Sequence, residues 1–168
     1  MQIRQIPVSE PGAPLPFDSL PVCQLCVFPD APGHDLPFAQ ARIYAEQGRS
    51  LHMKLSAYET GLPADSRFEA SFGPLRLELS PEGHRLLLDG QPLDHAAVRV
   101  TPVRGDDLQG EFWGTAIQLP LPVLRMALPD IGLLPGESLP FSLCKFRAST
   151  GYTARLFEED GYLELTAY

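Results

Sequence analysis

The segment SLHMKLSAYE, residues 50–59, decides the fold class of this chain. Its apolar residues stand at positions 51, 53, 55 and 57, and the positions between them carry polar side chains or Tyr58. A period of two residues is typical of a β-strand that has one face in the core and the other in water. One such strand needs partners, and the same pattern recurs elsewhere in the chain.

The same alternation occurs in PLRLELS, residues 74–80, and in GYLELTAY, residues 161–168. Further strands are expected at residues 22–28, 41–46, 84–89, 97–103, 110–120 and 138–146. Turn-forming residues separate them, at positions 46–48, 81–83, 89–90 and 104–107. Roughly nine or ten short strands at this spacing predict an all-β, antiparallel β-sandwich of the jelly-roll type.

The length of the chain and its proline content define its organisation. It has 168 residues, which favours a single domain over residues 1–168. Its 18 prolines disfavour long helices and long strands. Residues 1–21, with a proline-rich part from residue 7 onward, are expected to form an extended arm or an edge segment. The only helix predicted lies around residues 121–128, where the prolines stand at the helix start.

The charge of the chain bears on its partners. The formal net charge is −8 and the sequence pI is about 4.9. An acidic surface repels phosphate backbones, and the sequence has no run of Lys or Arg, so nucleic-acid binding is not expected. No apolar stretch is long enough to span a bilayer, and residues 1–17 lack the apolar core of a secretory signal. The sequence therefore predicts a cytoplasmic protein that does not bind membranes.

The motif content argues against an enzyme without excluding one. The sequence contains no G-x-S-x-G elbow, P-loop, dinucleotide-binding glycine fingerprint or H-E-x-x-H motif. Cys23 and Cys26 have the C-x2-C spacing of half a zinc site, but no second pair completes it. On a strand these two residues face opposite sides. We therefore expect no metal and no cofactor, and we expect the cysteines to be mostly buried.

Aromatic and acidic residues elsewhere in the chain have structural interpretations. Trp113, the only tryptophan, shares its strand face with Thr115, Ile117 and Leu119, which predicts a place in the core. The acidic residues at 106–107 and 158–160 stand beside glycines, which predicts solvated turns. A glycosidase would instead need two carboxylates that face each other across a sugar.

A candidate ligand site combines residues from the ends of two strands. Tyr58 and Glu59 end one strand, and Lys145 and Arg147 end another; Arg67 is a weaker candidate. If these residues converge, they supply an apolar ring and charged groups, which are the features that sugars require. The alternative is that Tyr58 and Glu59 merely end a strand, while Lys145 and Arg147 extend over a sheet edge.

From about residue 38 to the C-terminus, the chain resembles the family 9 carbohydrate-binding modules and their uncharacterised bacterial relatives. The resemblance rests on ARIYAEQGRSLHMKLSAYE (41–59), GEFWGTAIQLPLPVLRM (110–126) and LPGESLPFSLCKF (134–146). It implies a β-sandwich that binds sugar ends or short saccharides. The chain departs from the family in having one tryptophan, because characterised members hold a sugar between two.

The leading hypothesis is thus a non-catalytic module that binds a carbohydrate or another small polar ligand. The first alternative is an intracellular interaction or accessory protein that uses the sandwich surface or the proline-rich arm. The second alternative is a sugar-active enzyme, which would need a concave pocket with facing carboxylates or a metal. The sequence indicates neither the oligomeric state nor the identity of the ligand.

Overall fold

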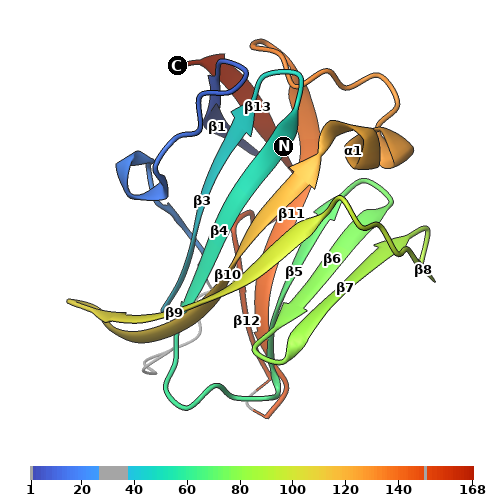
Figure 1. Ribbon diagram of the computed structural model, residues 1–168. Helices are drawn as coiled ribbons and strands as arrows, with labels where there is room; N and C mark the ends of the chain where they lie inside the picture. Colours follow the sequence, from blue (N-terminus) through green and yellow to red (C-terminus); the bar gives the residue numbers. More distant parts are fainter. Residues whose placement is uncertain (1, 27–37, 150) are drawn as a thin grey trace.

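The fold is almost entirely β-structure, as a computed structural model that describes residues 2–26, 38–149 and 151–168 shows (Figure 1). The strands are β1 Gln2–Ser9, β2 Cys23–Gln24, β3 Phe38–Glu46, β4 Ser50–Tyr58, β5 Ser66–Phe72, β6 Leu75–Ser80, β7 Gly83–Leu88, β8 Gln91–Pro92, β9 Arg99–Asp107, β10 Gly110–Pro120, β11 Ser138–Arg147, β12 Tyr152–Arg155 and β13 Gly161–Ala167. A short 3-10 turn covers Phe17–Ser19, and the helix α1 covers Leu121–Ala127.

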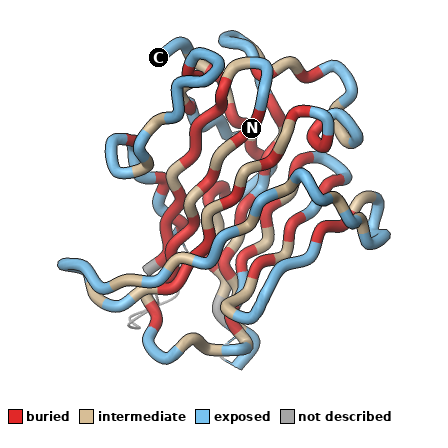
Figure 2. Tube along the Cα trace, in the orientation of Figure 1, coloured by how far each residue is buried: buried red, intermediate tan, exposed pale blue. Residues whose placement is uncertain are grey.

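The strands predicted from alternation are present with nearly the predicted bounds. The strand β10 covers the predicted residues 110–120, and β4 and β11 agree within about one residue of their predicted bounds. Figure 2 shows buried residues alternating with half-buried ones along much of β4 and β10, while nearly all of β3 is buried. Each of these strands thus has one face in the core, as a period of two requires.

The strands form one curled sheet in the order β8-β7-β6-β5-β11-β13-β1-β3-β4-β10-β9, with β12 beside β11 and β2 beside β3. The long strand β11 joins the two halves of the sheet. Its first residues, 138–141, pair with β13, and residues 142–147 pair with β5. The curl brings β5 opposite β10, where the rings of Phe68 and Trp113 lie 5.5 Å apart.

The N-terminal segment differs from the prediction. Residues 2–9 form a strand inside the sheet, β1, and not an extended arm. This strand runs parallel to both β13 and β3, so the sheet is mixed and not purely antiparallel. Only Val8 and Ser9 pair with β3. Pro7, which cannot donate a backbone hydrogen bond, therefore lies where β1 pairs on one side only among the described residues.

Four further segments differ from the sequence-based expectations. Residues 66–72 and 152–155 form strands, β5 and β12, that were not predicted. Residues 104–107 belong to β9 and do not form a turn, which lies at residues 108–109. Of the described residues in the strand predicted at 22–28, only Cys23 and Gln24 form a strand. Residues 27 and 28 lie outside the described part.

The helix and the core agree with the prediction. The helix α1 begins directly after β10, with Pro120 at its N-cap and Pro122 in its first turn, where a missing N–H costs nothing. Leu121, Val123 and Leu124 are buried and join one continuous hydrophobic cluster that includes residues of β3, β4, β5, β6, β10, β11 and β13. No helix among the described residues has the length and apolar character needed to cross a membrane.

Candidate functional site

Two polar clusters lie on opposite sides of the sheet where β4 ends. They are centred on consecutive residues, Tyr58 and Glu59. Neighbouring side chains on an extended backbone point to opposite faces, so Tyr58 is on the outer face while Glu59 turns inward. The candidate ligand residues therefore divide into two groups. The structure brings Glu59, Lys145 and Arg147 together, and it separates them from Tyr58.

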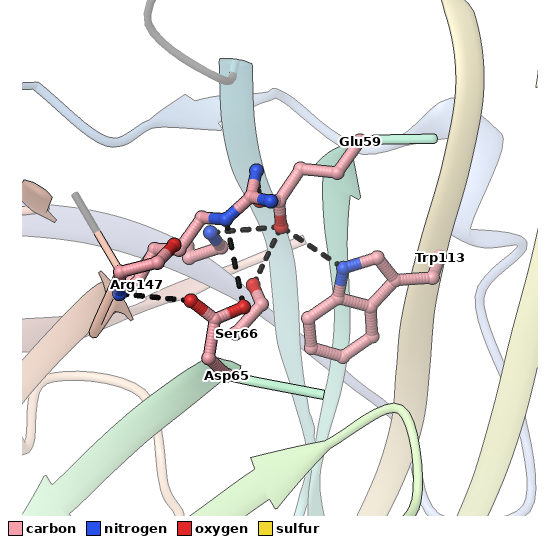
Figure 3. Close-up of polar contacts among 7 residues, drawn as sticks. Glu59, Asp65, Ser66, Trp113 and Arg147 are labelled. Carbon is pink, nitrogen blue, oxygen red and sulfur yellow. Dashed lines mark hydrogen bonds and ion pairs between the residues drawn. The ribbon is translucent and has the colours of Figure 1, made fainter. Parts of the chain in front are cut away.

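The inner cluster surrounds the carboxylate of Glu59 with four donor side chains from three strands (Figure 3). Its Oε1 atom accepts hydrogen bonds from Ser66 Oγ at 2.5 Å and from Trp113 Nε1 at 3.0 Å. Lys145 Nζ lies 2.8 Å from the same oxygen, and Arg147 Nη1 lies 3.2 Å from Oε2. The carboxylate thus connects the end of β4 with β5, β10 and β11.

Strand alternation explains why a lysine lies in this core. Phe141, Leu143 and Lys145 occupy alternate positions of β11 on its inner face, and all three are buried. The side chain of Lys145 has no exposed surface, so it does not extend over a sheet edge. A buried ammonium is tolerated only beside a counter-ion, which Glu59 supplies. Trp113 has the predicted core position, and its indole N–H also holds the carboxylate.

The ionisation of Glu59 should make folding sensitive to acid. Burial opposes its negative charge, but hydrogen bonds from Lys145, Ser66 and Trp113 outweigh this effect and lower the pKa of Glu59 below its ordinary value of 4.5. A lowered pKa in the folded state adds stability above the unfolded pKa, and that stability is lost as the pH falls through the folded value.

We therefore expect the free energy of unfolding to decrease as the pH falls below about 4.5, and part of this decrease to disappear in Glu59→Gln. Urea unfolding curves of both proteins at a series of pH values between neutral and about 3 measure the difference. Identical pH dependence of the two proteins would show that Glu59 does not titrate in this range.

The outer cluster is a pocket of about 290 Å³ on the solvent face of β3, β4 and β10, beside the β9–β10 hairpin. Two aromatic side chains line it, Tyr58 and Phe112, whose rings lie 5.5 Å apart. Its polar lining consists mainly of Asp18, Gln40, Arg42, Lys54, Ser56 and Asp107. The pocket thus combines ring surfaces with hydrogen-bonding groups of both charges.

The hairpin fixes the aromatic side of the pocket. The hydroxyl of Tyr58 donates a hydrogen bond of 2.8 Å to Asp107 Oδ2 at the end of β9. Burial and this carboxylate raise the pKa of Tyr58 to about 12, so the phenol keeps its proton at neutral pH. Phe112 pairs with Gly105 across the hairpin, and a Cβ at Gly105 would lie only 2.7 Å from the ring. The missing side chain lets the ring lie against β9.

Two cations occupy the strands beneath the pocket. Arg42 of β3 and Lys54 of β4 are directly opposite in the antiparallel ladder, and both are half-buried. The Nη1 atom of Arg42 donates to the backbone carbonyls of Phe17 and Leu20, at 3.0 and 3.5 Å. Within the described ranges, no carboxylate lies in ion-pair distance of either cation.

Arg67 lies outside both clusters. Its Nη2 atom is 3.1 Å from Glu69 Oε1, and its guanidinium carbon is 5.0 Å from the centre of the Phe146 ring. It borders another surface hollow, of about 430 Å³, along β5, β6 and β7. Arg85 also borders that hollow and pairs with Glu78. The cations there are neutralised by carboxylates, which makes that hollow a weaker candidate for ligand binding.

Sequence reasoning missed most residues of the outer pocket, although one signal was present. Lys54 and Ser56 share the polar face of β4 with Tyr58, and the alternation of residues 50–59 already places all three side chains on one side. The contributions of Arg42, Asp107 and Phe112 depend on strand pairing. No local pattern indicates that β3 and the β9–β10 hairpin lie beside β4.

The cysteines and other metal-ligating side chains form no cluster in the described ranges. Cys23 is buried, Cys144 is half-buried and Cys26 is exposed, so the expected burial holds fully only for Cys23. The difference between Cys23 and Cys26 agrees with their expected opposite orientation. Among the described residues, no three His, Cys, Asp or Glu side chains are close enough together to hold a metal ion. The acidic residues 106 and 107 end β9, and Asp107 binds Tyr58, so the expectation of a purely solvated turn was wrong at that residue.

Comparison with known proteins supports the fold. No protein-family model matches the chain, and no curated protein matches it either. A solved structure of a "putative carbohydrate-binding protein" from Bacteroides uniformis aligns with a TM-score of 0.65 and 14% sequence identity. The alignment covers 98% of this chain and 99% of that one. At this level of identity the likeness concerns the fold, and it extends over the whole described chain.

Proposed function

We propose that this chain is a non-catalytic binding domain of jelly-roll-like sandwich architecture that holds a saccharide in the Tyr58 pocket. The observation that carries the proposal is the pairing of Tyr58 and Phe112 rings with charged and amide groups around one hollow. A sugar ring has apolar C–H groups on its faces and hydroxyl groups around its edge. Aromatic side chains can pack against the faces, and charged or amide side chains can form hydrogen bonds with the hydroxyls.

The wider comparison agrees with this proposal. The structural neighbour named above is described as a "putative carbohydrate-binding protein", and the sequence resemblance to family 9 carbohydrate-binding modules implies the same ligand class. The pocket here lies on the face of the sheet and uses tyrosine and phenylalanine. It would therefore hold its ligand without the pair of tryptophans that characterised modules of that family use.

In this proposal the inner cluster supports the pocket and does not contact the ligand. The carboxylate of Glu59 is occupied by Ser66, Trp113, Lys145 and Arg147. Because Glu59 follows Tyr58 directly, fixing one residue restrains the other. We assign contact with the ligand to Tyr58. We assign to Glu59, Lys145 and Arg147 the role of holding the end of β4 in its position.

Replacing Tyr58 by alanine tests the proposal. We expect the native protein to bind at least one member of a panel of mono- and oligosaccharides, and Tyr58→Ala to weaken that binding at least tenfold. Losing about 1.4 kcal/mol of aromatic contact corresponds to a tenfold change. Isothermal titration calorimetry at up to millimolar sugar measures the affinities.

The matched control is Arg67→Ala, which alters the hollow along β5–β7 and leaves the Tyr58 pocket untouched. It should bind sugars as the native protein does. The absence of binding to any sugar at millimolar concentration would contradict the proposal. So would binding that Tyr58→Ala leaves unchanged.

A second candidate function, a protein-interaction surface, is favoured by the tip of the β9–β10 hairpin. The hairpin extends away from the body of the sheet (Figure 1), and Leu108 at its tip is fully exposed. An exposed leucine beside a pocket is a plausible anchor for a protein partner. Because Leu108 also lines the pocket, Leu108→Ser is compared with Tyr58→Ala. If the tip is the functional element, Leu108→Ser should abolish partner capture and Tyr58→Ala should not.

A further inference from the structure

We infer that the ligand of the Tyr58 pocket is an acidic saccharide whose carboxylate sits over Arg42 and Lys54. This inference rests on the proposed saccharide binding and specifies its chemical class. The sugar ring would lie against Tyr58 and Phe112, and its hydroxyls would meet Gln40, Ser56 and Asp107.

The placement of the two cations is the first argument. Arg42 and Lys54 are cross-strand partners whose side chains leave the same face of the sheet. Directly opposite residues have Cβ atoms about 5 Å apart, and like charges in that arrangement destabilise the sheet. The sequence could avoid this cost with a neutral residue at either position. An anion between the two charges would remove the repulsion.

The second argument is the contrast with the cations of β5, β6, β7 and β11. These cations all form ion pairs with carboxylates of this chain, namely Arg67, Arg76, Arg85, Lys145 and Arg147. The acidic chain therefore has carboxylates available, yet in the described ranges none pairs with Arg42 or Lys54. The cations Arg4, Arg99 and Arg104 of β1 and β9 also form no ion pair among the described residues, but unlike Arg42 and Lys54 they are exposed. Arg42 and Lys54 both border the pocket that holds the aromatic rings.

The third argument is that the guanidinium is preorganised. Backbone carbonyls of Phe17 and Leu20 hold Nη1 of Arg42, and no described residue accepts a hydrogen bond from its other donors, which could bind a ligand. These carbonyls fix the orientation of the Arg42 guanidinium without neutralising its charge. A carboxylate can accept two parallel hydrogen bonds from a guanidinium, while a lysine ammonium adds a third.

The charge of the surroundings favours a carboxylate over a phosphate. Asp18 and Asp107 also line the pocket, and the whole chain carries a net charge of −8. These negative charges repel a doubly charged phosphate more strongly than a singly charged carboxylate. A uronic acid combines one carboxylate with the apolar ring face and the hydroxyls that the remaining lining residues can bind.

The experiment compares sugars that differ at one group. Glucuronic and galacturonic acid and their short oligomers are titrated against their methyl esters, the parent neutral sugars, glucose 6-phosphate and inorganic phosphate. We expect the uronates to bind at least tenfold more tightly than their methyl esters, because the uncharged ester loses one charge-assisted hydrogen bond. We also expect this preference to weaken as salt is added.

Variants of Lys54 then locate the anion. Lys54→Gln should lose most of the preference for uronates, whereas Lys54→Arg should keep it and Arg85→Gln, in the distant hollow, should have no effect. Because Lys54→Gln also removes the repulsion from Arg42, it should unfold at the same temperature as the native protein or a higher one. A role of Lys54 in folding alone would instead lower the unfolding temperature.

The outcomes separate this inference from the proposed function. Equal binding of neutral and acidic sugars, or a uronate preference that survives in Lys54→Gln, would overturn the inference and leave saccharide binding intact. Tighter binding of phosphate or glucose 6-phosphate than of uronates would overturn the choice of a carboxylate. Failure of every sugar to bind would overturn both the inference and the proposed function.

Discussion

Replacing Glu59 by glutamine is expected to lower the free energy of unfolding by about 3–5 kcal/mol, the largest stability loss that the structure predicts for a single polar side chain. Glutamine has nearly the same shape, but it leaves the fully buried ammonium of Lys145 without a negative charge. It also weakens the hydrogen bonds from Ser66 and Trp113, which join β5 and β10 to β4. Urea denaturation at neutral pH measures the loss.

A second substitution distinguishes charge burial from loss of packing. If the cost arises from the uncompensated ammonium, adding Lys145→Met to Glu59→Gln should recover part of the stability. Glu10→Gln, at an exposed acid, is the control and should change stability by less than about 0.5 kcal/mol. A Glu59→Gln loss below about 1 kcal/mol, or a double variant less stable than Glu59→Gln alone, would contradict the structural role of the cluster.

Replacing Gly114 by alanine is expected to destabilise the protein by about 2–3 kcal/mol. Gly114 lies in β10 between Ser56 of β4 and Val103 of β9. A Cβ atom at this position would overlap the backbone carbonyl oxygen of Leu55, which no side-chain rotation can relieve. The β4 and β10 backbones would have to move apart directly beneath the Tyr58 pocket. Thermal and urea unfolding of the variant measure this effect.

Gly83→Ala is the matched control for Gly114→Ala. A Cβ at Gly83 has open space around it, and its backbone is not in the left-handed region. This variant should change stability by less than about 0.5 kcal/mol. If the two alanine variants unfold alike, the close approach of β4 and β10 at Gly114 is not a feature of the protein in solution.

Local alternation predicted most of the strands because each of them buries one face. The strands β4, β6, β10, β11 and β13 follow this rule closely, and the helix α1 agrees with its flanking prolines. The strand β5 carried the same signal, with Phe68, Ala70 and Phe72 buried, but no strand was predicted there.

The strand β1 could not be predicted in the same way. Its first four described residues are exposed, and it contains Pro7. Its register with β13 pairs Ile6 with Leu165, residues from opposite ends of the chain. Pairing at such a distance in sequence has no local signature, and a parallel ladder has no connecting turn to indicate it. The same limit explains why a purely antiparallel arrangement was expected.

The sequence indicated several residues of the candidate site, but it did not indicate how they are arranged in space. Grouping Glu59 with Lys145 and Arg147 was right about proximity, since all three meet in the inner cluster. Alternation along β11 could have indicated that Lys145 is buried, because it follows Phe141 and Leu143 at even spacing. It could also have separated Tyr58 from Glu59, since consecutive residues on a strand cannot share a face.

Chemical-shift mapping during titration with a short uronate oligosaccharide tests the central claim, saccharide binding in the Tyr58 pocket, most directly. We expect the backbone amide signals that move to belong to residues 40–42, 54–58 and 107–112, on the outer face of β3, β4 and the β9–β10 hairpin. Signals at residues 78–85, along the second hollow, should stay in place. Shifts confined to that second hollow, or no shifts at millimolar ligand, would contradict the account.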